Sequence, residues 1–361
     1  MKDIEILTVL HICDYAAPYK GNFIDSLEAL ERYHNPIRNI YLFPARARHT
    51  EAEKWISELN ASGKTAYIQE DTFWKNVLLF RRITETHQVD RVIRHFSDLR
   101  IDAILKLFYN SKRVVRFFHG GYVVKSTLKH RIKKLLWKHN HFVGVSDAVA
   151  EQVQRAFPGW FVVPLANAIH FERLDAVEPF ERVTGISLLM MGWDYSIKGV
   201  DLAVNAVARL LGKHDLTLQI VGGMNEDAIR KLAREILGED PEWIRYLPST
   251  NQIGTYYHAN DIFLSPSRRE AFGYANIEAA YCENSIVLSR VDGQAQLLIE
   301  GAYWVERENV EELVSQLEEA ILQLHSPERI ALRRRVREQV LQTYSLEAWS
   351  RKLADLLINL K

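Results

Sequence analysis

Short apolar runs alternate with longer segments of helical period along the whole chain. Runs such as Ile186–Met191 and Leu216–Val221 have the length of strands, and the segment between them, Val200–Leu211, has apolar residues at helical spacing. Strands that alternate with helices in this way form parallel sheets covered by helices. The pattern therefore predicts an α/β protein, and 361 residues are enough for two such domains.

The predicted elements fall into two halves. Strands of the first half are predicted at Ile6–Ile12, Asn39–Phe43, Thr65–Ile68, Val114–Phe118, Phe142–Val145 and Phe161–Val163. Strands of the second half are predicted at Ile186–Met191, Leu216–Val221, Trp243–Tyr246, Ile262–Leu264, Ile286–Leu288 and Tyr303–Val305. Helices are predicted at Phe23–Arg32, Glu51–Ala61, Asp147–Ala156, Val200–Leu211, Glu226–Leu237, Gln252–Ala259, Tyr274–Cys282, Val310–Leu324 and Leu346–Lys361. The stretch His170–Thr184 has no strand pattern and is predicted to connect the halves.

The net charge of zero conceals a difference between the halves. Residues 1–165 hold 25 Lys and Arg against 17 Asp and Glu, whereas the remaining residues hold 21 against 29. Within the first half, residues 103–146 carry ten Lys and Arg, four His and no acid. Such an asymmetry indicates that the two halves have different partners.

A basic amphipathic helix is predicted within this acid-free stretch. Its cations are Lys125, Lys129, Arg131, Lys133, Lys134 and Lys138. Apolar residues such as Leu128 and Leu135 lie between them, and helices of this kind lie on anionic membrane surfaces. A surface helix that packs on the sheet with a solvated cationic face fits the pattern equally well. Nucleic-acid binding is disfavoured, because no known binding motif accompanies the charge.

The sequence also indicates a compartment. Cys13 and Cys282 lie far apart and form neither a disulfide scaffold nor a cysteine zinc cluster. Asp3 and Glu5 interrupt the apolar N-terminus, and no run of 18 apolar residues occurs, so neither a signal peptide nor a transmembrane helix is predicted. We expect a cytoplasmic chain, with peripheral attachment to the inner face of the plasma membrane as a hypothesis that the basic helix raises.

The segment after the predicted strand Ile262–Leu264 is the richest in candidate chemistry. Its polar loop contains Glu270, and a helix is predicted to begin just after Gly273. Exposed amides at such a helix start favour an anion. Glu278 lies inside the helix among small apolar residues, where a buried carboxylate needs a partner. Taken singly, either glutamate fits a solvated surface acid as well.

The spacing Glu270-x7-Glu278 within Ser-Pro-Ser-x-x-Glu-Ala-Phe-Gly resembles the signature of the retaining family 4 glycosyltransferases, which have the GT-B architecture. Further segments resemble the family pattern in the same order along the chain, namely His119-Gly120-Gly121, Val143–Asp147, Met191–Asp201 and Tyr344–Trp349. The resemblance implies two facing Rossmann-like domains, a cleft between them and a C-terminal helix that crosses back to the first domain. Residues 1–168 with helix 346–361 would form the acceptor-side domain, and residues 169–345 would bind the nucleotide-sugar donor.

The resemblance also implies roles for single residues. Lys198 would bind the donor diphosphate, and its place beside Gly199 at a helix start suits that role. Glu270 and His119 would contact the donor sugar, and these three residues are the predicted catalytic group. Glu278 would hold the ribose. The other predicted donor contacts are Gly21, Gly192, Trp193, Arg268, Phe272, Gly273 and Tyr274, with Leu247, Pro248 and Ser249 near the base. The predicted acceptor-side residues are Asp14, Tyr15 and Asn22.

The chain departs from the family pattern at three places. Trp193 stands where many members have an arginine that binds phosphate, and Arg268 or Arg269 is a candidate substitute. Asn167–His170 differs from the usual Asn-Gly-Val/Ile-Asp. Lys20–Asn22 supplies one glycine where the family often has two.

The predicted function is a retaining transfer of a hexosyl or N-acetylhexosaminyl group. The donor would be a nucleotide diphosphate sugar, with UDP favoured over GDP, and the acceptor a hydroxyl of a glycan, a lipid-linked glycan or another glycoconjugate. The resemblance implies no cofactor and no catalytic metal, because Lys198 and the helix-start amides would stabilise the leaving group. Two alternatives stay open: a sugar-nucleotide epimerase of the same fold, and a non-catalytic protein that binds a glycan or a partner glycosyltransferase.

Overall fold

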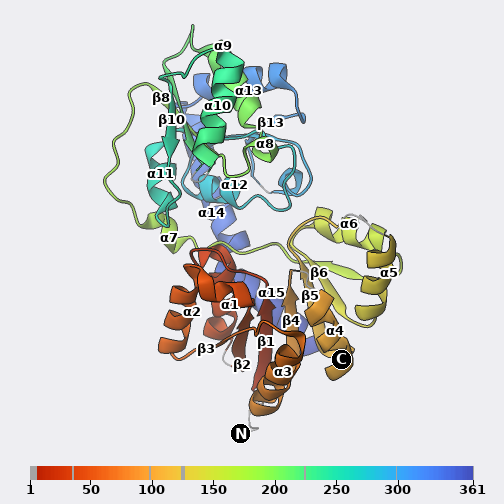
Figure 1. The fold of residues 1–361 in the computed structure, drawn as a ribbon. Helices are drawn as coiled ribbons and strands as arrows, with labels where there is room; N and C mark the ends of the chain where they lie inside the picture. The colour runs from red at the N-terminus through yellow and green to blue at the C-terminus, as the bar shows by residue number, and fades with distance from the viewer. Residues whose placement is uncertain are drawn as a thin grey trace. The chain divides into compact units, whose positions relative to one another are not determined.

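Two α/β units make up the part of the chain that the structure describes. The computed structural model describes residues 6–360 except 35, 97–98, 123–126, 223–224 and 298 (Figure 1). Unit 1 comprises Met1–Ala168 together with Leu346–Lys361, and unit 2 comprises Ile169–Ser345. The two units end at the same residues as the domains expected from the sequence.

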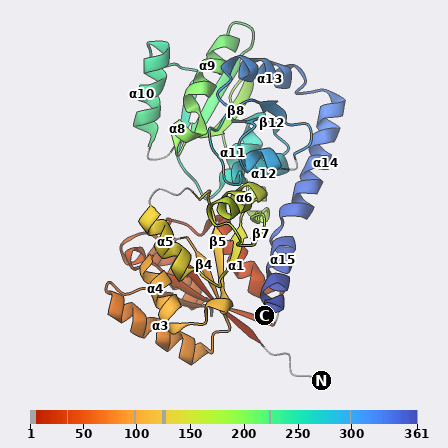
Figure 2. The same cartoon turned by 90° about the vertical axis from the view of Figure 1, so that its right-hand side faces the viewer.

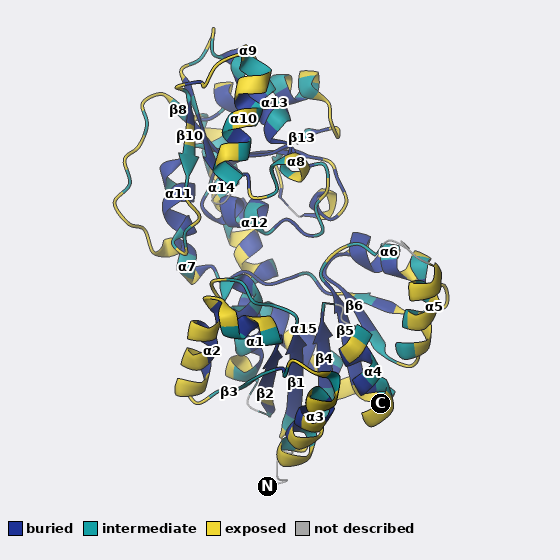
Figure 3. Cartoon of the chain, viewed as in Figure 1, coloured by how far each residue is buried: buried dark blue, intermediate teal, exposed yellow. Residues whose placement is uncertain are grey.

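In its described residues, unit 1 has one sheet of seven parallel strands in the order β3-β2-β1-β4-β5-β6-β7. The strands are β1 (Leu7–Cys13), β2 (Ile37–Phe43), β3 (Thr65–Ile68), β4 (Arg91–His95), β5 (Val114–Phe118), β6 (His141–Gly144) and β7 (Val162–Pro164). The helices are α1 (Gly21–Tyr33), α2 (Ala52–Ala61), α3 (Phe73–His87), α4 (Leu99–Phe108), α5 (Thr127–Leu136), α6 (Asp147–Ala156) and α15 (Leu346–Asn359). Figure 3 shows most of the strands in the colour of buried residues, as expected for a parallel sheet between helices.

β4 is a central strand that the sequence pattern does not predict. Arg91, Arg94 and His95 interrupt its apolar run, yet Arg94 and His95 are buried. The guanidinium of Arg94 donates hydrogen bonds to the carbonyls of Ile12 and His95, so this cation is held by backbone oxygens inside the sheet. The prediction of six strands for this half was therefore wrong by one. The helices α3 and α4 of this unit and the helix Pro327–Tyr344 of unit 2 were not named in the prediction either.

In its described residues, unit 2 has a sheet of six parallel strands in the order β10-β9-β8-β11-β12-β13. The strands are β8 (Ile186–Met191), β9 (Leu216–Val221), β10 (Ile244–Leu247), β11 (Ile262–Ser265), β12 (Ser285–Ser289) and β13 (Tyr303–Val305). The helices are α7 (Glu172–Asp175), α8 (Tyr195–Lys198), α9 (Val200–Leu210), α10 (Glu226–Leu237), α11 (Ile253–Ala259), α12 (Tyr274–Tyr281), α13 (Val310–Leu322) and α14 (Pro327–Tyr344). Aliphatic residues of β8, β9 and α9 form the centre of its core.

Two local features position the ends of the units. The predicted connection His170–Thr184 has no strand, contains α7 and is held to α11, because the amide of Glu178 donates to Thr255 and Arg182 donates to the carbonyl of His258. The closing helix α15 packs on α1 within unit 1 and buries Trp349 and Leu353 (Figure 2). No helix among the described residues is long and apolar enough to cross a membrane.

Candidate active site

The order of the strands in unit 2 reverses between β8 and β11. From β8 the chain runs outward to β9 and β10, and from β11 it runs outward the other way to β12 and β13. Neighbouring parallel strands of this kind bind ligands beyond their carboxyl ends, at the point where the order reverses. Lys198 follows β8 and Glu270 follows β11, so both predicted residues belong to the switch point of this sheet.

Lys198 and Glu270 form an ion pair at this point. The Nζ of Lys198 lies 2.5 Å from Oε2 of Glu270, and the two side chains are 12% and 17% exposed. The same ammonium lies 5.3 Å from the centre of the Trp193 ring, within the range of a cation–π contact. The structure thus brings three of the predicted donor residues together, with a cation that an incoming anion can contact.

The backbone at position 199 requires a glycine directly after Lys198. The φ of Gly199 is +70°, and a Cβ at this position would lie only 2.2 Å from the carbonyl oxygen of Pro266. The close approach brings the end of α8 against the loop after β11, where the amide of Arg268 donates to the carbonyl of Ile197 at 2.7 Å. Only glycine fits both the conformation and the contact. The two loops therefore hold Lys198 beside Glu270.

Arg268 lies in the loop after β11 and is bonded to groups within the protein. Its guanidinium makes two hydrogen bonds to Asp201, at 2.8 and 2.7 Å, and further bonds to Glu308 at 2.8 Å and to the carbonyl of Ser196 at 2.7 Å. The bonds to Asp201 raise the pKa of Arg268, which stays charged. These partners engage the guanidinium of Arg268 within the protein, and the choice between Arg268 and Arg269 as the substitute for the missing phosphate arginine stays a prediction. Arg268 ties the loop after β11 to α8, and Arg269 is exposed.

The helix start after Glu270 has the predicted geometry. Gly273 has φ +97° and directly precedes Tyr274, the first residue of α12. A Cβ on Gly273 would lie 3.5 Å from Cγ of Glu270, so the start of α12 is adjacent to the Lys198–Glu270 pair. Phe272 is buried and fixes this turn by packing on Tyr344. The positive end of the α12 dipole therefore lies next to the ion pair.

Glu278 is buried in α12, and its carboxylate has partners within the protein. Arg173 of α7 donates to Oε1, and the hydroxyl of Tyr257 in α11 donates to Oε2 at 2.9 Å. Each carboxylate oxygen can accept two hydrogen bonds, so a ribose hydroxyl would share the group with these partners. The sequence gives no signal for Arg173 or Tyr257, because they lie in other helices.

The other predicted residues of unit 2 lie at the ends of β8 and β10. A Cβ on Gly192 would lie 2.6 Å from Cγ2 of Ile220, so packing alone requires this glycine. Trp193 is 62% exposed. Leu247 ends β10 and is half-buried, whereas Pro248 and Ser249 are exposed in the loop that follows it. Their place beyond the carboxyl end of β10 puts them two strands away from β8, on the same edge of the sheet.

In unit 1, His119 is the outer member of a row of three histidines. It follows β5, is half-buried, and its Nε2 lies 3.1 Å from Nδ1 of His95. The Nε2 of His95 lies 3.3 Å from Nδ1 of His11, whose Nε2 lies 3.0 Å from Oδ1 of Asn39. Burial lowers the pKa of His11 to about 4 and that of His119 to about 3, and it holds the pKa of His95 well below its usual range. All three imidazoles are therefore neutral at pH 7.

The sequence pattern could not find this row, since β4 was not predicted. β1 and β4 are neighbours at the switch point of the first sheet, and β5 is the next strand. The register pairs His11 of β1 with Ile93 of β4, and His95 of β4 with Phe117 of β5. Each histidine of the row therefore lies two residues beyond the register partner of the previous one, on the same face of the sheet. None of the described side chains forms a cluster of three or more groups that could hold a metal ion, and the histidines bond to one another.

The predicted acceptor-side residues follow β1, in the loop to α1 and in the first turn of that helix. Asp14 bonds to Arg46, and both line a cavity of about 210 Å³ together with residues that follow β2 and β3. The hydroxyl of Tyr15 donates to the carbonyl of Tyr19 and does not line this cavity. Asn22 is buried in the first turn of α1, and Gly21 begins that helix with φ +58°. The structure thus places Asp14 alone of the predicted acceptor residues at this cavity.

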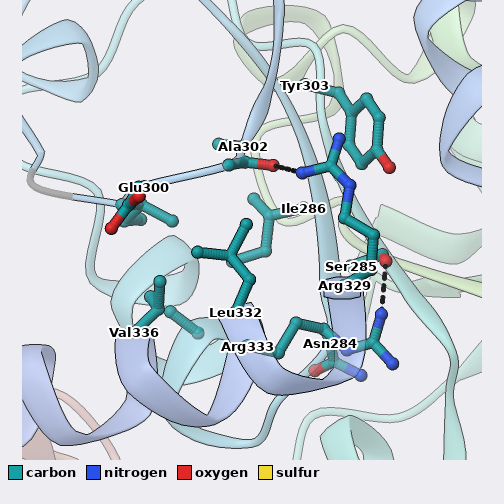
Figure 4. A pocket seen from close by; sticks show the side chains of 13 residues that line it. Asn284, Ser285, Ile286, Glu300, Ala302, Tyr303, Arg329, Leu332, Arg333 and Val336 are labelled. Atoms are coloured by element: carbon teal, nitrogen blue, oxygen red, sulfur yellow. Dashed lines mark hydrogen bonds between the residues drawn. The ribbon is translucent and has the colours of Figure 1, made fainter. Parts of the chain in front are cut away.

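Another cavity in unit 2 is unrelated to the predicted site. It has a volume of about 20 Å³, room for one water molecule, and lies between β12, β13 and α14. Figure 4 shows Arg329 and Arg333 of α14 reaching across its lining, where Arg333 donates to the hydroxyl of Ser285. No predicted site residue lines it, so we interpret it as a small packing cavity and not as a ligand site.

Comparison with known proteins shows which family this region is similar to. Residues 177–339 match the family model described as glycosyl transferases group 1, and this range includes Lys198, Glu270 and Glu278. An uncharacterized glycosyltransferase of Haemophilus influenzae is 26% identical over 306 residues, which cover 76% of this chain and 82% of the relative. The two comparisons support a glycosyltransferase of group 1.

One further sequence relative and one solved structure are also similar to the chain. A Homo sapiens relative, one of the subunits of phosphatidylinositol N-acetylglucosaminyltransferase, is 30% identical over 271 residues, which cover 71% of this chain and about half, 54%, of the human protein. The crystal structure of Anabaena Alr3699/HepE in complex with UDP and glucose superposes with a TM-score of 0.76 at 14% identity, and covers 98% of this chain and 100% of that one. The chain therefore has the GT-B type of fold, with two Rossmann-like domains, as the sequence predicts.

Proposed function

We propose that the chain is a retaining, metal-independent glycosyltransferase that moves a hexosyl or N-acetylhexosaminyl group from a UDP-sugar to a hydroxyl of a glycan or lipid-linked glycan. The observation that carries the proposal is the Lys198–Glu270 pair at the switch point of unit 2, beside the start of α12. The likeness to a protein crystallised with UDP and glucose supports the choice of donor.

The mechanism follows from the charges at this point. The ammonium of Lys198 and the positive end of α12 stabilise the negative charge that develops on the leaving diphosphate. As the bond from the anomeric carbon to the phosphate oxygen breaks, the acceptor oxygen forms a new bond to that carbon on the same face. The acceptor proton passes to the departing phosphate oxygen. Glu270, released from Lys198 by the phosphate, accepts hydrogen bonds from hydroxyls of the sugar.

The test is turnover of purified protein with UDP-glucose, UDP-N-acetylglucosamine and GDP-mannose, with and without a mixture of bacterial glycolipids. We expect release of UDP that depends on the acceptor and exceeds release of GDP, and a product that keeps the anomeric configuration of the donor. Conversion of the nucleotide sugar without an acceptor would indicate an epimerase instead. A folded protein that neither binds nor turns over any of the three donors would indicate a non-catalytic binding protein.

The proposal includes attachment to an anionic membrane through α5. None of the described residues of this helix is buried, and Figure 3 shows it largely in the colour of exposed residues. Leu128 and Leu135 are 67% and 66% exposed, on a helix whose outer side also carries Lys129 and Lys134. Packing against the sheet would bury these leucines, so their exposure favours the membrane interpretation. Lys125, the first cation of the predicted helix, lies outside the described residues.

Removing either the lysine charges or the exposed leucines of α5 is expected to weaken membrane binding. The variant Lys129→Gln/Lys134→Gln loses about 1 kcal/mol for each lysine near the surface, or about 30-fold in partitioning. The variant Leu128→Ser/Leu135→Ser loses the apolar contact and is expected to bind at least about tenfold less. Co-sedimentation with phosphatidylglycerol vesicles measures both. Leu322→Ser is the matched control, since Leu322 is 73% exposed on α13 of unit 2. Binding that both double variants retain would refute the attachment.

A further inference from the structure

The amide of Asn39 has one orientation, and this fixes the direction of the histidine row. Its Nδ2 donates to the carbonyl of Leu27 at 2.6 Å and to the hydroxyl of Tyr41 at 3.3 Å. A carbonyl only accepts, so the nitrogen of the amide must face Leu27. The Oδ1 of Asn39 therefore faces His11, and His11 must donate its Nε2–H to that oxygen.

The orientation of Asn39 determines which nitrogen donates and which accepts in each imidazole of the row. A neutral imidazole has one N–H, so His11, which donates from Nε2, accepts at Nδ1. His95 must then donate its Nε2–H to His11 and accept at its own Nδ1. His119 must donate its Nε2–H to His95, which leaves Nδ1 of His119 as an acceptor. No described residue bonds to this nitrogen, and His119 is the half-buried member of the row, whereas His11 and His95 are fully buried.

We propose that Asn39, His11 and His95 are positioning residues that hold His119 in its Nε2–H tautomer, so that Nδ1 accepts a hydrogen bond from a hydroxyl of the transferred sugar. The inference rests on the proposed function, because it assigns the ligand of His119 from the donor. It restricts the donor to sugars with a free hydroxyl at that position. A sugar that carries no hydrogen-bond donor there would leave a lone pair unsatisfied.

The aromatic surroundings support a fixed orientation of His119. Phe96 stacks on its ring at 4.5 Å, and Phe23 meets it edge-on at 5.3 Å. Phe23 also contacts His95 edge-on at 5.0 Å. These contacts hold the ring planes, so the tautomer rather than a rotation of the ring determines what Nδ1 offers to a ligand.

The first measurement is the tautomer itself, in the unmodified protein. A long-range proton–nitrogen correlation spectrum of the full chain, with labelled histidine, distinguishes Nε2–H from Nδ1–H for each residue. We expect His11, His95 and His119 to be Nε2–H tautomers at pH 7. An Nδ1–H tautomer or a charged ring at His119 would overturn the proposal, whatever the activity. Absence of any turnover with this tautomer present would refute the proposed function alone.

The second measurement compares intact and monodeoxy UDP-sugar donors. The variant Asn39→Leu removes the acceptor for His11 and is expected to give a mixture of tautomers at His119. The preference of the wild type for the donor with the critical hydroxyl should then fall several-fold, up to about tenfold, while kcat/KM for the deoxy donor changes little. Tyr41→Phe is the control, since the bond from Asn39 to Leu27 remains. Equal loss for both donors would indicate a merely structural role and overturn the proposal.

Discussion

Replacement of Lys198 by alanine is expected to lower kcat/KM for sugar transfer by about 100- to 1,000-fold. The magnitude is that of removing one preorganised donor from a site where charge develops. The loss should be larger in kcat than in KM, because the charge on the diphosphate grows as the bond to the sugar breaks. The loss of activity also has a second cause. Without the ammonium of Lys198, which lies 2.5 Å from Oε2 of Glu270, that carboxylate has no neighbouring cation and repels the phosphate.

The matched control is Lys213→Ala. Lys213 pairs with Glu318 at 2.9 Å in the same unit, but its side chain is 65% exposed and lies outside the site. Its removal is expected to change kcat/KM less than about twofold, because exposed ion pairs contribute little. Steady-state kinetics with UDP-glucose, with binding of UDP followed by calorimetry, checks both variants. Wild-type rates in Lys198→Ala would refute the assignment of the site.

The variant Asp102→Asn is expected to destabilise unit 1 by about 3–5 kcal/mol, the usual effect of removing one partner from a buried group of charges. Asp102 is 1% exposed and lies 2.9 Å from the guanidinium of Arg116 and 3.6 Å from that of Arg94, both of which are buried. Its other oxygen accepts from the indole of Trp137 at 2.7 Å. In the variant, the buried guanidinium groups of Arg94 and Arg116 would lose the negative charge that Asp102 supplies.

Amide hydrogen exchange of the full chain measures the loss of stability in unit 1, and the amides of unit 2 serve as the internal reference. Amides of β4 and β5 should exchange about 100- to 5,000-fold faster in the variant, whereas amides of β8 and β9 in unit 2 should keep their wild-type rates. Asp71→Asn is the control, because Asp71 is 83% exposed and lies 3.8 Å from Arg48. We expect it to cost less than about 0.5 kcal/mol. Unchanged exchange in β4 would show that the carboxylate does not stabilise the pair of arginines.

The two units differ in how far the sequence predicts them. In unit 2, Ile186–Met191 and Leu216–Val221 are apolar runs buried on both faces, and their bounds were predicted to the residue. In unit 1, β4 was missed because Arg94 and His95 resemble a polar loop until their partners are known. Periodicity reports burial of apolar residues, but it carries no information about which distant group neutralises a buried charge.

The candidate site shows the same division. The strand-to-helix junctions and the family resemblance placed Lys198 and Glu270 in one site, and the structure brings them into contact. The partners of Arg268 were not predictable, since Glu308 is forty residues away in sequence and any of several acids could have paired with it. Sequence spacing therefore predicts which junction a residue occupies, and tertiary contacts decide whether its charge is available to a ligand.

The chain enters unit 1, leaves it for unit 2 and returns only at its end. α15, the last helix, covers α1, one of the first. A ribosome therefore completes residues 169–345 while the earlier domain still lacks its closing helix. The domain that is synthesised first is the last to be finished, and its face on α1 stays uncovered by α15 during the synthesis of the second. A nascent chain that stalls near residue 345 would carry a finished unit 2 on an unfinished unit 1.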